Sequence, residues 1–331
     1  MSDPSPSVWR QALLALLFAA LLPLATNSLP LSGTILAFAI AAAGCNLLLG
    51  YAGLLSFAQG TFFGVGSYAA ALLLKQWPAL GLLVLLPVAC AGVLVALAIS
   101  LLSTRQKGIY FVMITLAMAQ LAYFAALSFP QVTGGENGLL DVPRPALPAV
   151  PGLSDNLMFY GALALVMVLA MAVLAMVVSS PFGQALEAIR ENEVRAETLG
   201  FRIGRLKAQA FCLSGAFTAV AGALYAMQLR SAQLSAIDLL TSESIVIMAI
   251  LGGRRSMLGS ALGAAAMLLM SEYLSAVWPR WQMIVGFVLI AVVLYFPHGL
   301  AGAWRQLGAP ARLWAAWQWF RNAKSAPVEV R

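Results

Sequence analysis

Ten apolar segments run through the sequence, and they limit the possible folds more than any other feature. A helix needs about 20 apolar residues to cross a bilayer core that is about 30 Å thick. Backbone polar groups inside lipid need partners within the protein, so spanning helices are expected, and continuous runs do not alternate as a barrel requires. We therefore predict an all-α, polytopic integral membrane protein with about ten transmembrane or partly spanning helices. The segments cover residues 11–26, 31–49, 54–74, 80–102, 109–127, 158–179, 209–228, 243–253, 257–277 and 282–296.

The composition of the 331-residue chain also indicates that its solvent is lipid. Hydrophobic residues make up 62% and charged residues 9% of the chain, and the mean hydropathy is +0.90. A soluble domain carries about 25% charged residues. The net charge of +7 reflects membrane topology, so no nucleic-acid partner is expected. The three cysteines lie singly in apolar segments without CxxC spacing, which favours small buried residues over a metal or redox site.

The positions of lysine and arginine predict the orientation of the helices, because basic residues concentrate on the cytoplasmic side. With the N-terminus inside and each segment crossing in turn, only four of the 19 basic residues fall outside. These four are Lys75, Arg144, Arg230 and Arg280. Segment 243–253 is short, but counting it as a crossing keeps Arg254, Arg255 and the basic tail inside. We therefore expect both termini in the cytoplasm.

The chain divides into one membrane domain, residues 1–302, and a tail, residues 303–331. Within the domain, residues 128–157 form a proline- and glycine-rich loop expected outside, and residues 180–208 form a cytoplasmic loop. The tail interleaves tryptophans with basic residues, which favours a helix in the inner headgroup layer over a partner-binding segment. No convincing cleavage site follows the first apolar segment, so we expect a membrane helix there and not a signal peptide.

Residues 183–207 form a strongly polar stretch between two long apolar segments. The stretch holds four of the 12 acidic and five of the 19 basic residues of the chain. Ser180 and Pro181 suit the cap and the first position of a helix, and Gly200 suits its end. We predict a helix from Pro181 to Leu199 at the cytoplasmic membrane surface. Its charged neighbourhood consists of Glu187, Arg190, Glu191, Glu193, Arg195, Glu197, Arg202, Arg205 and Lys207.

The pattern of this predicted helix allows two interpretations. Glu187 and Arg190 have the spacing of an ion pair on a solvated helix, and so do Glu191 and Arg195. A helix that only connects two spans would show the same pairs. A short helix with a few apolar residues among charges is also what a groove on a soluble partner accepts. The apolar residues that gather toward one side are Phe182, Leu186, Ile189 and Ala196.

Residues 50–74 combine glycines with polar side chains inside an apolar segment. Gly60 and Gly64 have the GxxxG spacing that lets helices approach closely, and helix packing is the favoured interpretation of the glycines. The amide of Gln59 needs a partner in lipid, so we expect Gln59 to face a cavity or another helix. Glycine-interrupted helices with polar side chains such as Ser56 are also where transporters build solute paths.

Several kinds of site are missing from the sequence. His298 is the one histidine, so no Ser/His/Asp set or HExxH zinc motif can be assembled, and we expect no catalytic or metal-binding residues. No charged residue falls near the middle of a segment, where a charge costs ~2.5–3.5 kcal/mol and is normally kept for coupling. This argues against a proton-coupled carrier and leaves a sodium-coupled carrier open. For uphill transport, it favours energy input from the cytoplasmic side.

A set of motifs in a fixed order adds a family resemblance. The motifs are GYAGLLSFAQG at 50–60, FGVGSY at 63–68, YFVMITLA at 110–117, TGGENGL at 133–139, GQALEAIRENE at 183–193, ILGG at 250–253 and GSALG at 259–263. In this order they resemble the LivM-type permease subunit of the branched-chain amino-acid ABC transporters, from about residue 36 to residue 302. His298 and the pair Arg254–Arg255 depart from the pattern of that family.

The resemblance implies a type II-like ABC importer permease in the bacterial inner membrane. It implies import of leucine, isoleucine and valine, with urea or short amides as alternative substrates within the family. The implied partners are a second, LivH-type permease subunit, two ABC ATPase subunits, an external solute-binding protein and membrane lipid. The chain has no Walker A motif, so partner ATPases would use ATP and Mg²⁺, and we expect no cofactor on this chain.

The candidate site residues form two sets. The ATPase-coupling helix would use Phe182, Leu186, Glu187, Ala188, Ile189, Arg190, Glu193 and Gly200. The translocation path would include Ser56, Gln59, Tyr68, Thr115, Thr133, Gly134 and Gly135. The last three belong to a glycine-rich external turn, which either exposes backbone amides to a ligand or is a flexible connection.

Overall fold

The computed structural model describes residues 8–145, 154–278, 280–295, 299–300 and 302, so the predicted tail and His298 lie outside the described residues. Each of the ten predicted apolar segments corresponds to a helix, and the prediction of an all-α polytopic fold is confirmed. Seven stretches of the described residues are long and apolar enough to cross a membrane. The ten helices are α1 (Val8–Thr26), α2 (Leu29–Asn46), α3 (Gln59–Gln76), α4 (Leu85–Ser103), α5 (Ile109–Ser128), α7 (Asp155–Ser179), α10 (Ile203–Leu229), α11 (Leu239–Gly252), α12 (Met257–Val277) and α13 (Trp281–Tyr295).

Shorter helical segments connect these helices. They are η1 (Leu47–Ala52), η2 (Pro78–Val84), α6 (Pro130–Thr133), η3 (Gly135–Asn137), α8 (Pro181–Glu191), α9 (Glu193–Thr198) and η4 (Leu234–Ala236). The predicted segment 54–74 begins too early, because α3 begins at Gln59, and the segment 209–228 begins too late, because α10 begins at Ile203. The chain leaves the π-helical segment η1 at Gly53, whose φ of 70° ends the helix, and residues 54–58 form an irregular apolar connection. Hydropathy alone does not reveal this break.

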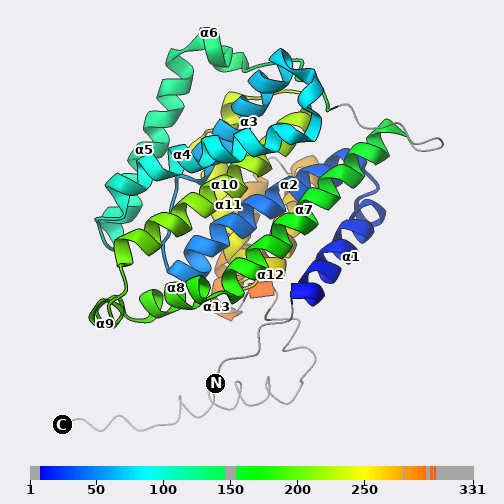
Figure 1. The fold of residues 1–331 in the computed structure, drawn as a ribbon. Helices are drawn as coiled ribbons and strands as arrows, with labels where there is room; N and C mark the ends of the chain where they lie inside the picture. Colours follow the sequence, from blue (N-terminus) through cyan, green and yellow to red (C-terminus); the bar gives the residue numbers. More distant parts are fainter. Residues whose placement is uncertain (1–7, 146–153, 279, 296–298, 301, 303–331) are drawn as a thin grey trace, which may run out of the picture.

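Helix α2 forms the centre of the bundle. From Ile35 to Ala52, a range that includes η1, every residue is buried. Helices α7, α10 and α12 pack around it, and Figure 1 shows α2 between α7 and α10. A helix that is apolar on all sides suits lipid as well as a protein core. The small residues of α2, such as Ala37, Ala41 and Gly44, favour its central position because they let neighbouring helices approach closely.

Glycines bring α10 into direct contact with α3 and α4. A methyl group added at Gly66 of α3 would collide with the Ala219 carbonyl, and one added at Gly222 of α10 would collide with the Phe63 carbonyl. A methyl group added at Gly92 of α4 would meet the Ala219 side chain and the Gly215 carbonyl of α10. Small residues at such contacts let two backbones pack tightly in lipid, where no hydrophobic driving force holds helices together.

The GxxxG pair of α3 also serves packing, as the sequence predicts. A side chain at Gly60 would meet Ser242 at the start of α11, and one at Gly64 would meet Ile237 beside η4. The Gly60 N–H donates a hydrogen bond of 2.7 Å to the Ser242 hydroxyl. The glycines of α3 therefore pack against α10, α11 and the residue that follows η4.

The charged connections gather at two ends of the bundle. Lys107, between α4 and α5, and Arg255, between α11 and α12, both form ion pairs with glutamates of the polar stretch. Figure 1 shows α8 and α9 at one end, which we call the α8 end, and α6 at the other, the α6 end. Near α6, Leu139 and Ala232 form a β-bridge. This grouping agrees with the predicted alternation of crossings.

The contact between α3 and α10 predicts a sharp difference between glycines. We expect Gly66→Ala and Gly222→Ala each to lower the stability of the detergent-solubilised protein by about 1–3 kcal/mol, because the added methyl overpacks a backbone contact. Gly161→Ala in α7 is the matched control, since no atom lies within 4 Å of an added methyl there. Thermal unfolding measures the effect, and equal stability of all three variants would contradict the packing described.

Candidate functional site

The polar stretch folds into two short helices where one was predicted. Helix α8 ends at Glu191, Asn192 is extended with a φ of −158°, and α9 starts at Glu193. The Asn192 side chain accepts a hydrogen bond of 3.0 Å from the Arg195 N–H and so caps α9. The predicted continuous helix from Pro181 to Leu199 was wrong, because an asparagine that can cap a new helix interrupts it.

The predicted ends of the stretch are placed correctly. Pro181 occupies the first turn of α8 after an extended Ser180. The Ser180 hydroxyl does not cap α8 but donates to the Val177 carbonyl at 2.6 Å. Gly200 has a φ of 88° directly after Leu199, so it ends α9 as a glycine in the left-handed region does.

The apolar side of α8 faces the protein's own core. Leu186 and Ile189 are buried and Phe182 is half-buried, while Ala188 is partly exposed. The expectation that these residues are offered to a soluble groove therefore needs correction, because α7, η1 and α10 already cover them. Within the polar stretch, the most exposed large apolar residues lie in and just after α9, where Val194 and Leu199 are 68% and 70% exposed.

The two predicted ion pairs within the stretch are replaced by pairs with another segment. Arg255 lies 3.6 Å from a Glu187 carboxylate oxygen and 4.0 Å from one of Glu191. Arg190 instead donates a hydrogen bond to the Gly50 carbonyl of η1. Burial, together with the nearby charges of Arg255 and Arg254, lowers the pKa of Arg190. These charges are therefore not merely solvated, since they join α8 to η1 and to the α11–α12 turn.

The turn between α11 and α12 is also bound to the central helix. The buried Asn46 amide donates to the carbonyls of Gly253 and Ser256 at 3.2 and 3.0 Å, and to the Ser260 hydroxyl at 2.8 Å. The Tyr51 hydroxyl donates to the Arg255 carbonyl at 2.8 Å. One cluster thus connects α8, η1 and the turn. We call it the α8 junction, and it consists of Asn46, Gly50, Tyr51, Glu187, Arg190, Glu191, Gly253, Arg255, Ser256 and Ser260.

Glu193 anchors α9 to two further segments. One of its carboxylate oxygens lies 3.0 Å from the Lys207 ammonium and 3.3 Å from that of Lys107. Lys207 is almost fully buried. Partial burial raises the pKa of Glu193, but the hydrogen bonds and charges of the two lysines outweigh it, so the net pKa lies below its usual range. Glu193 therefore joins α9 to α10 and to the α4–α5 connection.

Part of the predicted translocation path forms a buried polar cluster between helices. The Gln59 amide donates to Ser214 at 3.0 Å and accepts from Thr218 at 2.8 Å, both on α10. The expectation that Gln59 meets another helix is thus confirmed. Nearby, the Thr115 hydroxyl of α5 accepts from the Phe57 N–H at 3.3 Å, and the Ser56 hydroxyl accepts from the Ala58 N–H at 3.2 Å. These groups hold the irregular connection before α3 in place.

The other path candidates lie apart from this cluster. Tyr68 is buried in α3, and its hydroxyl has no hydrogen-bond partner among the described residues. Thr133, Gly134 and Gly135 belong to the turn at the α6 end, where the Thr133 hydroxyl donates to Ala126 and accepts from the Gly135 N–H. Gly134 and Gly135 have φ values of 77° and 65°, so the turn needs these glycines for its own conformation. The structure does not bring all seven candidates together.

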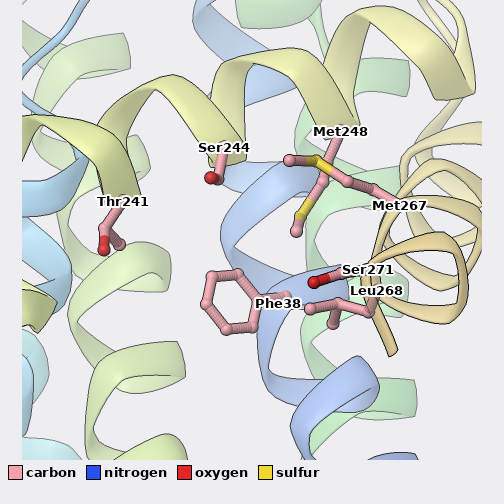
Figure 2. Close-up of a pocket in the computed structure, with 7 residues that line it drawn as sticks. All are labelled: Phe38, Thr241, Ser244, Met248, Met267, Leu268 and Ser271. Carbon is pink, nitrogen blue, oxygen red and sulfur yellow. The ribbon is translucent and has the colours of Figure 1, made fainter. Parts of the chain in front are cut away.

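A cavity that the sequence did not indicate lies between α2, α11 and α12. Its volume is about 100 Å³. Figure 2 shows the side chains around it, which combine three hydroxyls with apolar groups. They belong to Phe38, Thr241, Ser244, Met248, Met267, Leu268 and Ser271. The serines were overlooked because single hydroxyls in apolar helices usually bond to their own backbone, and only the packing shows otherwise.

Comparisons with known proteins agree on one family. The family model described as "Branched-chain amino acid transport system / permease component" matches residues 28–294. The high-affinity branched-chain amino acid transport system permease protein LivM of Escherichia coli K12 is 30% identical over 283 residues, covering 78% of this chain and 66% of that protein. LivM of Salmonella typhimurium LT2 is 28% identical over 325 residues, covering 90% and 76%. The probable LivH permease of Methanocaldococcus jannaschii is 29% identical over 278 residues, covering 76% and 84%. No solved structure matches the chain.

The anchor at Glu193 predicts a pH-dependent contribution to stability. We expect Glu193→Gln to lower the free energy of unfolding by about 1.5–3 kcal/mol at pH 7, since it removes charge-assisted hydrogen bonds to a buried lysine. A carboxylate with a lowered folded pKa stabilises the protein above its unfolded pKa of about 4.3, and this contribution disappears as the pH falls through the folded pKa. The gap between variant and wild type should therefore close below that pH in thermal unfolding.

Glu197→Gln is the control for this prediction, because Glu197 is exposed on the same short helix. Its unfolding should match the wild type within about 0.5 kcal/mol at every pH, as for an ordinary surface substitution. A Glu193→Gln variant as stable as the wild type at pH 7 would contradict the anchor.

Proposed function

The chain belongs to the family of permease components of branched-chain amino acid transport systems, and from this premise we propose that it forms part of the membrane pathway of an ATP-driven importer. The relatives are named as permease proteins of transport systems, so the proposal makes this chain a conducting subunit and not an enzyme. ATP and Mg²⁺ would be bound by separate ATPase subunits, and this chain would bind no cofactor.

The α8 junction is the observation that carries the proposal. A polar helix with a buried apolar side is joined by Arg190 to the central helix and by Arg255 to the turn between two membrane helices. A displacement of α8 would therefore move η1 and the α11–α12 turn together. An importer driven by a soluble motor needs such a connection between the membrane surface and the solute path.

The exposed part of α9 is the contact that we propose for the ATPase subunits. Val194 and Leu199 present apolar side chains at the α8 end, and the exposed charges of Glu191, Arg195 and Glu197 surround them. A few apolar groups framed by charges suit a groove on a soluble protein. In this arrangement Leu186 and Ile189 transmit the movement within the chain, and Glu193 and Gly200 set the position of α9.

The remaining partners and the location follow from the same proposal. The chain would lie in a bacterial inner membrane, with its termini and the α8 end in the cytoplasm, where two ATPase subunits dock. A second, LivH-type permease would complete the pathway. A solute-binding protein would deliver the solute at the α6 end, beside the turn that contains Thr133, Gly134 and Gly135.

Branched-chain amino acids are the substrates that we propose, because the relatives named LivM and LivH carry that description. We expect vesicles containing the chain, its partner permease and both ATPases to take up labelled leucine, isoleucine and valine when the binding protein, ATP and Mg²⁺ are supplied. Omission of ATP should reduce uptake at least tenfold. Uptake of urea in place of the amino acids, or sodium-driven uptake by the chain alone, would overturn this assignment.

The ion pair between Glu187 and Arg255 predicts a charge-swap rescue. We expect Glu187→Arg and Arg255→Glu each to reduce amino acid uptake at least fivefold, because each change places like charges together in the α8 junction. The swapped double variant should recover most of the uptake. ATP hydrolysis by the assembled complex should persist in all three variants, because the substitutions change the α8 junction and leave the ATPase subunits intact.

Lys75→Glu is the matched control for the swap, because Lys75 is exposed in the last turn of α3 and its side chain forms no ion pair with another described residue. Its uptake should stay within twofold of the wild type. If the double variant is as impaired as the single ones, the Glu187–Arg255 pair does not carry the coupling.

A further inference from the structure

The cavity between α2, α11 and α12 has the size of a small aliphatic group. Its volume is about 100 Å³, somewhat less than the ~150 Å³ of an apolar protein cavity that binds benzene. The seven lining residues carry no charge. Phe38 comes from the central helix, while Met248 and Met267 come from α11 and α12 and are buried. Methionine side chains adapt to differently shaped apolar groups, so these walls suit several aliphatic side chains.

Two hydroxyls in this apolar cavity lack partners. A serine within a helix usually donates to the carbonyl of the preceding turn, as Ser275 does to Glu272 at 3.2 Å. No described residue forms a hydrogen bond with the hydroxyl of Ser244 or Ser271. Both hydroxyls line the same cavity, and Figure 2 shows that of Ser271 near the Phe38 ring. A polar group that enters the cavity would therefore meet two hydroxyls that are free to donate or accept a hydrogen bond.

The walls of the cavity are connected to the α8 junction. Helices α11 and α12 supply six of the seven lining residues and meet at the turn that contains Gly253, Arg255 and Ser256. The central helix supplies the seventh, Phe38, and also Asn46, which hydrogen-bonds to that turn. A movement of α8 would therefore be transmitted to all three walls of the cavity, through Arg190 to the end of α2 and through Arg255 to the α11–α12 turn.

We propose that this cavity is a solute-binding site of the permease, which holds the aliphatic side chain of the transported amino acid against Phe38, Met248 and Met267. Ser244 and Ser271 donate and accept hydrogen bonds at the polar end of the solute, because a hydroxyl can do both. The proposal rests on the proposed function and adds to it the residues that contact the solute. Access to the site is governed by the position of α8.

Substitutions that fill the cavity test the proposal in the assembled transporter. We expect Ser271→Leu to reduce leucine uptake at least tenfold while the amount of complex and its ATP hydrolysis stay near wild type. Ser275→Leu is the matched control, because Ser275 is exposed one turn further along the same helix, and its uptake should remain within twofold. Normal uptake by Ser271→Leu would overturn the proposal.

The size of the cavity gives a second readout that misfolding cannot imitate. Met267→Ala enlarges the cavity, so we expect the uptake ratio of phenylalanine to valine to rise at least threefold relative to wild type. Uptake by the wild type in the same assay tests the proposed function independently. If the wild type transports amino acids but the phenylalanine-to-valine ratio of Met267→Ala is unchanged, only the assignment of the cavity is contradicted.

Chemical labelling tests the cavity without requiring transport. In a full-length chain with Cys45, Cys90 and Cys212 replaced by alanine, we expect Ser271→Cys to react with a water-soluble thiol reagent, and excess leucine to slow the reaction at least threefold. Labelling only by a lipid-soluble reagent would assign the cavity to a lipid chain. Equal rates with and without leucine would also contradict the proposal.

Discussion

Lipid supplies no hydrogen-bond partners, and this constraint explains where the buried amide side chains of the bundle lie. The two buried amides of the described core show how the chain meets it. Gln59 is matched by Ser214 and Thr218 of α10, and the NH2 group of Asn46 donates to the α11–α12 turn and to Ser260 of α12. The hydrogen bonds that these amides need in lipid therefore also join helices that are distant in sequence.

The irregular segments of the bundle stay in place for the same reason. Between α2 and α3 the chain passes through the π-helical η1 and a non-helical connection, and both expose backbone groups. Arg190 binds the Gly50 carbonyl, and Thr115 and Ser56 bind the N–H groups of Phe57 and Ala58. Non-helical backbone is tolerated at membrane depth only where protein or water covers it. The irregular segment that follows α2 is thus the place where α8 contacts the core, through Arg190 and the Gly50 carbonyl.

Local patterns predicted the helices of this protein well, and distant contacts explain what they missed. Apolar length predicted the ten long helices, and the distribution of bases predicted which connections share an end. The break at Asn192 was missed because an asparagine inside a helical pattern and one that caps a new helix look alike. The partner of Glu187 was missed because Arg255 is far away in sequence, and the nearer Arg190 had suitable spacing. The cavity depends on how three helices pack, which no single segment encodes.

Burial of α8 changes how its charges should be understood. If α8 lay at the membrane surface without packing against the bundle, a partner protein could move α8 without moving the membrane helices. Leu186 and Ile189 lie in the interior, and their apolar contacts make α8 a part of the bundle. Two arginines determine which segments α8 contacts. Arg190 of α8 binds the Gly50 carbonyl at the end of the central helix, and Arg255 of the α11–α12 turn pairs with Glu187 of α8. Apolar burial thus attaches α8 to the bundle and the charged pairs determine which segments it is attached to, so the proposed movement of α9 would reach the proposed site between α2, α11 and α12.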